Sequence, residues 1–196
     1  MTINNDEILN QIMEYISSMK HIKPEDIPNI ELYMDQVTTF MNAQLESSKR
    51  YPEDKILTKT MINNYAKNHL LPAPNKKKYT KEHLLMLIFI YYFKSFLSMS
   101  DIQALLNPLS EHYFQGENTF NIENIYQEVF SMEKEQLEYL KENIAKKYET
   151  AMHTFQDAPE KEKDFLQLFS FVTLLSYDVY VKKQIIETII DSFPSD

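Results

Sequence analysis

Glycine is almost missing from this chain of 196 residues, which contains Gly116 and no other. Loops that cradle phosphate groups need several glycines, because backbone N–H groups approach a phosphate closely only where no Cβ intervenes. The Rossmann, P-loop and kinase classes of nucleotide-binding enzyme are therefore excluded. Tight hairpins also favour glycine, so an all-β fold is not expected.

Cysteine is absent altogether, which excludes disulfide bonds, thiolate metal sites and a cysteine nucleophile. The first residues are polar and acidic, without the basic and apolar regions of a secretory signal. Of the two most apolar runs, 84–93 is too short to cross a bilayer and 165–181 is interrupted by polar residues. We therefore expect a cytoplasmic protein that does not insert into membranes.

The clearest pattern that the sequence does contain is helical periodicity. Apolar residues recur at spacings of three and four along most of the chain, which predicts an all-α fold. One predicted helix covers residues 30–45, and another follows Thr58, a good N-cap. At Thr80 the capping box is expected to be incomplete, because the third helical residue is His83. The short helix after Ser98 is predicted to end at Asn107-Pro108.

The last predicted helix, 161–193, is apolar on nearly every side between residues 165 and 180. Such a helix must be covered on most sides, either by the core of this chain or by a second copy. Its aromatic residues are Phe165, Phe169, Phe171, Tyr177 and Tyr180. Packing in a core or a dimer interface is the favoured interpretation of this cluster, and a pocket for a small apolar effector is the alternative.

Charge is distributed unevenly. The whole chain carries −9, yet residues 49–82 contain nine lysine and arginine residues against three acidic ones. A basic island in an acidic chain attracts polyanions. The alternative is a solvated lysine-rich surface without a partner.

An ordered series of motifs occupies residues 56–106. Its members are Tyr65, Leu70-Leu71-Pro72-Ala73-Pro74, Tyr79-Thr80 after three lysines, and Ser98-Met99-Ser100-Asp101-Ile102 with Leu105-Leu106. The series resembles the DNA-binding half of MerR-like winged helix-turn-helix regulators, where a wing follows the recognition helix. The preceding IPNIELYMDQVTTFMN resembles the opening of a bacterial family of proteins of unknown function (domain of unknown function 1836). The chain is identified as a member of that family.

The resemblance implies three regions: an N-terminal helix at 1–26, a winged helix-turn-helix-like module at 27–106 and a helical dimerisation or sensing region at 119–193. The expected architecture is thus the MerR-like module plus a C-terminal helical bundle half. The function it implies is transcription regulation by binding duplex DNA as a homodimer, without catalysis and without a cofactor. The alternative is a protein-interaction adaptor on the same scaffold that has lost DNA binding.

The predicted DNA-binding residues come from the helix after Thr58 and from the wing. Asparagine can pair with adenine edges, and lysine neutralises phosphates as a point charge. We expect Met61 and Ile62 to pack inward with Tyr65, leaving the polar residues outside. The predicted set is Lys59, Thr60, Asn63, Asn64, Tyr65, Lys67, Lys76, Lys77, Lys78 and Tyr79.

The chain departs from the MerR-like pattern at informative positions. Asn63 stands where arginine is usual, and His69 stands where glycine is usual. Lysines replace the arginines common in the wing, so bidentate arginine–guanine contacts are not available. Elsewhere, Glu149 and His153 share a helix face, and we interpret them as a surface ion pair rather than a metal site.

Overall fold

The computed structural model describes residues 5–19, 21–115 and 120–193. Helix accounts for 70% of the structure and strand for 3%, which confirms the mostly helical class. The chain divides into two compact units, one of residues 1–20 and 131–186, the other of residues 21–130 and 187–196. Gly116 and the first residue of the predicted region 119–193 lie outside the described residues.

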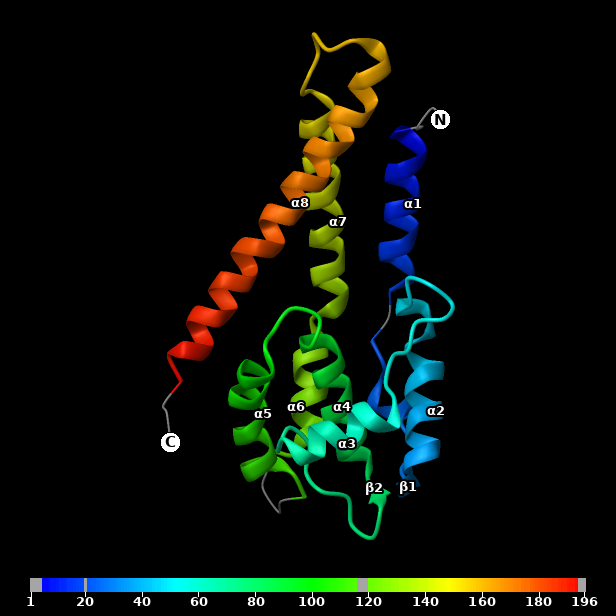
Figure 1. The fold of residues 1–196 in the computed structure, drawn as a ribbon, viewed down its shortest axis with the longest axis vertical. Helices are drawn as coiled ribbons and strands as arrows, with labels where there is room; N and C mark the ends of the chain where they lie inside the picture. The colour runs from blue at the N-terminus through cyan, green and yellow to red at the C-terminus, as the bar shows by residue number, and fades with distance from the viewer. Residues whose placement is uncertain (1–4, 20, 116–119, 194–196) are drawn as a thin grey trace. The chain divides into compact units, whose positions relative to one another are not determined.

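Helix α4 (Lys81–Phe93) forms the centre of the unit that contains residues 21–130 (Figure 1). Its residues 84–90 are all buried, so the apolar run seen in the sequence is a helix covered on every side. Helices α5 (Met99–Tyr113) and α6 (Ile122–Ser131) follow it. The ring of Tyr126 in α6 lies 5.4 Å from that of Phe89 in α4, and its hydroxyl donates to the carbonyl of Ile22.

Ahead of α4, the same unit contains β1 (Leu32–Tyr33), α2 (Met34–Gln44), α3 (Lys59–Lys67) and β2 (Lys78–Tyr79). Single-turn 3-10 helices lie at Pro24–Asp26 and Glu46–Ser48. The strands are antiparallel, with Leu32 opposite Tyr79 and Tyr33 opposite Lys78. The prediction that α2 begins at residue 30 is wrong, because β1 takes the residues before Met34 into the sheet. Helix α2 contacts α3 and both strands, and so holds these elements together.

The predicted end of the helix after Ser98 is also wrong. Helix α5 runs through Asn107-Pro108 and continues to Tyr113. Proline removes one backbone hydrogen bond from a helix interior. The buried side chains of Ile102 and Leu106 hold α5 in place on the N-terminal side of that proline, so tertiary packing overrides the local stop signal.

The other unit contains α1 (Asn5–Ser18), α7 (Glu133–Met152) and most of α8 (Glu160–Asp191). Tyr148 and Ala151 of α7 meet Phe171 of α8 in its buried centre, with apolar residues of α1 packed against them. Lys147 and Asp178 join α7 to α8 by an ion pair of 2.6 Å. None of the helices in the described ranges is both long and apolar enough to cross a membrane.

The core of this chain does not cover α8 on most sides. Of its five aromatic residues, Phe171 is buried, whereas Phe165, Phe169, Tyr177 and Tyr180 are exposed. Core packing therefore explains Phe171 alone, and the other four lie on a face that α1 and α7 leave uncovered.

Candidate nucleic-acid interface

Helix α3 has an apolar face turned into its unit and a polar face turned outward. Thr58 caps it, since its hydroxyl oxygen accepts the Met61 N–H at 3.2 Å. Ile62 and Tyr65 are buried and Met61 is half-buried, as their spacing along the helix requires. The exposed residues are Lys59, Thr60, Asn63, Asn64 and Lys67.

The C-terminus of α3 is fixed by a Schellman motif. The N–H groups of Leu70 and His69 donate to the carbonyls of Tyr65 and Ala66, at 2.9 Å and 3.3 Å. His69 occupies the left-handed position with φ of 59°. This explains why glycine would suit the position, and it means that the histidine is held there at some energetic cost.

A hairpin follows, and its tip is formed by two lysines. Asn75 and Lys78 bridge as an antiparallel pair, and the Lys78 N–H donates to the Asn75 carbonyl at 2.9 Å. Lys76 and Lys77 between them both have positive φ, 48° and 65°. Two consecutive left-handed residues define a type I′ turn, which normally selects Asn-Gly. We name residues 75–79 the wing; its tip presents two exposed ammonium groups.

Acidic residues around β1 connect both lysine-bearing elements to the same stretch of chain. Glu31 pairs with Lys78 at 3.0 Å, and Asp35 pairs with Lys59. The side-chain hydrogen bond from Lys78 to Glu31, together with their Coulombic attraction, raises the pKa of that lysine. Because Glu31 and Asp35 are four residues apart, the start of α3 and the base of the wing lie at the same end of α2.

These ion pairs divide the predicted lysines into two groups. Lys59 and Lys78 have acidic partners that the sequence did not reveal, because those partners lie outside the basic island. Among the residues that the structure describes, no ion pair involves Lys67, Lys76 or Lys77. These three supply the unneutralised positive charge of the surface.

Two of the predicted contact residues lie below the surface. Tyr65 is 6% exposed and Tyr79 is 3% exposed, so neither ring is available to a duplex in this structure. Burial raises the pKa of both hydroxyls. Tyr65 anchors α3 and Tyr79 anchors the wing, so both are positioning residues. We define the α3–wing surface by its exposed members, Lys59, Thr60, Asn63, Asn64, Lys67, Lys76, Lys77 and the half-buried Lys78.

His83 is a positioning residue that the sequence reasoning misjudged. The prediction of an incomplete capping box at Thr80 is wrong, because His83 Nδ1 accepts the Thr80 N–H at 3.0 Å. Its ring is buried edge-on to Tyr79 and Phe114. Burial lowers the pKa of His83 to about 4, partly offset by backbone carbonyls of the turn before the wing. The sequence signal that could have predicted this role is the position of His83, three residues after the N-cap Thr80.

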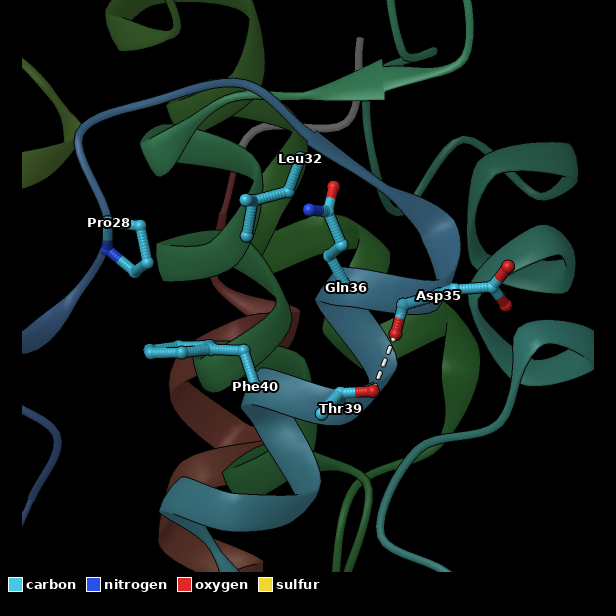
Figure 2. Close-up of a pocket in the computed structure, with 6 residues that line it drawn as sticks. All are labelled: Pro28, Leu32, Asp35, Gln36, Thr39 and Phe40. Atoms are coloured by element: carbon cyan, nitrogen blue, oxygen red, sulfur yellow. Dashed lines mark hydrogen bonds between the residues drawn. The ribbon is translucent and has the colours of Figure 1, made fainter.

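An open apolar groove of about 370 Å³ lies beside β1 (Figure 2). Pro28, Leu32 and Phe40 border it, and the carboxylate of Asp35 points away from these side chains. Within the described ranges, no three histidine or acidic side chains gather to form a metal site. The apolar border gives the groove the character of a surface for an apolar side chain.

Comparison with known proteins adds one result. No curated protein and no solved structure matches the chain. Residues 22–129 match the family described as Domain of unknown function (DUF1836), a stretch that includes β1, α2, α3, the wing, α4 and α5. The chain belongs to this family of Domain of unknown function (DUF1836) proteins.

Proposed function

We propose that the α3–wing surface binds duplex DNA and that the protein is a MerR-like transcription regulator. It acts in the cytoplasm by binding as a homodimer, without catalysis. The observation that carries the proposal is the wing tip. Two adjacent lysines occupy left-handed backbone positions that a type I′ turn would give to asparagine and glycine. Strain retained at an exposed, charged position is typical of functional sites.

The polar face of α3 supports the same proposal. A recognition helix reads base edges in the major groove, and phosphate contacts fix its register. Asn63 and Asn64 are exposed along the middle of α3, with Lys67 at its end. Asparagine is suited to the N6 and N7 atoms of adenine. A preference for A·T-containing sites follows from this side-chain chemistry.

The number of unpaired lysines sets the expected strength of the electrostatic contribution. Each neutralised phosphate contributes about 0.9 to the slope of log affinity against log salt. Lys67, Lys76 and Lys77 therefore give a slope of about −3 per chain. Lys59 and Lys78 contribute further only where a phosphate displaces Asp35 or Glu31.

A salt titration of the full chain on random and genomic duplexes tests the proposal. The wild type is expected to bind with a steep salt dependence. Replacing Lys76 and Lys77 by glutamine is expected to weaken binding to all sequences and to flatten the slope by about 2 per chain. The matched control changes Lys134 and Lys146 on α7, also exposed, to glutamine and so removes the same charge elsewhere.

Salt-insensitive or absent binding of the wild type would refute DNA recognition and favour the adaptor function. The groove bordered by Pro28, Leu32 and Phe40 is the observation behind that second candidate, because it would accept an apolar side chain of a partner protein. Phe40→Asp would then abolish partner binding, whereas the glutamine variants at the wing tip would leave it unchanged.

A further inference from the structure

The turn that follows α3 exposes a histidine whose side chain has no partner in the part of the chain that the structure describes. His69 is exposed, and no ion pair, side-chain hydrogen bond or ring contact involves its imidazole there. The neighbouring Asn68 differs, because its side-chain amide donates to the Asn64 carbonyl at 2.8 Å. Of these two polar side chains, that of His69 is therefore the one available to a ligand.

The backbone around His69 is held in one conformation. Leu70 and Leu71 are buried, and their N–H groups both donate to the Tyr65 carbonyl, at 2.9 Å and 3.3 Å. The Schellman motif therefore presents the imidazole in a fixed place, and a ligand does not have to order the turn when it binds. Because the same bonds occupy the last carbonyls of α3, an anion at this end of the helix would meet the imidazole rather than unsatisfied carbonyl oxygens.

The residue type at this position points to an anionic ligand. Glycine would adopt the φ of 59° without strain, and asparagine tolerates it better than most residues. Neither can gain a positive charge near neutral pH, as histidine does. Lys67 is exposed two residues earlier, and the sequence contains no acidic residue between Asp54 and Glu82. The imidazole thus lies in the most basic stretch of the chain, between α3 and the wing.

We propose that the His69 imidazole donates a hydrogen bond to a backbone phosphate of DNA at the C-terminal end of α3, as a further contact of the α3–wing surface. This inference rests on the proposed function. Protonation of the imidazole adds a positive charge to the contact, so one more counterion is released when the phosphate is bound. The contact therefore makes DNA affinity increase as the pH falls below neutral, and it makes the salt dependence steeper there.

Salt titrations of the full chain on a duplex at two pH values test the contact. The wild-type slope of log affinity against log salt is expected to be steeper by about 0.9 per chain at about pH 5.5 than at about pH 8. His69→Asn keeps a residue that tolerates the left-handed backbone and removes the imidazole. It is expected to abolish the difference between the two slopes and to weaken binding at the lower pH by about three- to ten-fold. Its melting temperature is expected to be at least that of the wild type.

Two features of the chain keep this measurement specific. His83 stays neutral at both pH values, because burial lowers its pKa to about 4. His153→Asn is the matched control, since His153 is an exposed histidine at the end of α7, in the other unit. This control is expected to bind as the wild type does and to keep the difference between the two slopes.

The outcomes separate this contact from the proposed function. A His69→Asn variant that keeps both the wild-type affinity and the difference between the slopes would overturn the contact. The proposed function would still stand if the glutamine variant at Lys76 and Lys77 flattens the slope. A wild type without salt-sensitive binding to any duplex would overturn both. If the asparagine variant melts below the wild type, His69→Gly decides, because glycine adopts the backbone angle without strain; wild-type binding by that variant would overturn the contact.

Discussion

A single double substitution at the wing tip is expected to raise the stability of the protein and to lower its affinity for DNA. Lys76 and Lys77 both have positive φ in a two-residue turn whose preferred sequence is Asn-Gly. Replacing them together by asparagine and glycine relieves the backbone strain and removes both positive charges. A stabilised protein that binds DNA less well is therefore the expected result.

The magnitude follows from the backbone angles. A left-handed non-glycine residue costs about 1–2 kcal/mol. Relief of that strain by glycine is offset by roughly 0.5–1 kcal/mol, because glycine loses more conformational entropy when the chain folds. The net stabilisation for the pair is about 1 kcal/mol, which raises the melting temperature of a chain of this size by roughly 2–4 °C. The salt slope of DNA binding falls by about 2 per chain.

Thermal unfolding and a salt titration on the same preparations measure both effects. The glutamine pair at Lys76 and Lys77 is the companion variant, because it removes the charges and keeps the strain. Both variants are expected to lose binding equally, and only the Asn-Gly variant is expected to gain stability. An Asn-Gly variant that melts at or below the wild-type temperature would refute the turn assignment. Unchanged binding would refute the role of the wing.

Three further predictions concern the residues that shape the α3–wing surface. His69→Gly is expected to stabilise the protein by about 0.5–1 kcal/mol, seen as a higher urea midpoint at constant slope; a lower midpoint would contradict the left-handed cap. Asn63→Ala is expected to reduce discrimination between preferred and random duplexes by about 1–3 kcal/mol and to leave the salt slope unchanged, measured by competition. The stability that neutral His83 provides is fully present above about pH 6.5 and is lost as the pH falls to about 4, because its folded pKa of about 4 lies below the unfolded value. Stability is expected to fall by up to roughly 3 kcal/mol across that window in denaturant titrations, with a flatter profile for His83→Gln.

The local features of α3 could be predicted from the sequence, because they depend on neighbours within a few residues. A threonine cap at Thr58 and apolar residues three apart at Ile62 and Tyr65 determine where the helix begins and which side faces inward. The prolines after Leu71 likewise predict an extended segment. For these elements, periodicity and capping chemistry agree with the tertiary fold.

The wing turn and its ion pairs could not be predicted in that way. Glycine is the usual sequence sign of a type I′ turn. Here Lys76 and Lys77 occupy both central positions, because β2 must return to pair with β1. The partnership of Glu31 with Lys78 joins residues 47 positions apart, which no spacing rule reveals. Burial of Tyr79 follows from that same long-range pairing.

The acidic partners also limit the positive charge that one chain offers to a duplex. Glu31 and Asp35 neutralise Lys78 and Lys59 in the free protein, so a phosphate must compete with a carboxylate at each of these positions. The three lysines of the α3–wing surface that have no ion pair give a single chain a limited electrostatic attraction for a duplex, because the whole chain has a net charge of −9. Binding as the proposed homodimer is expected to double these lysines to about six on one duplex and to make the second contact intramolecular. DNA affinity is therefore expected to depend on dimer formation as much as on the α3–wing surface.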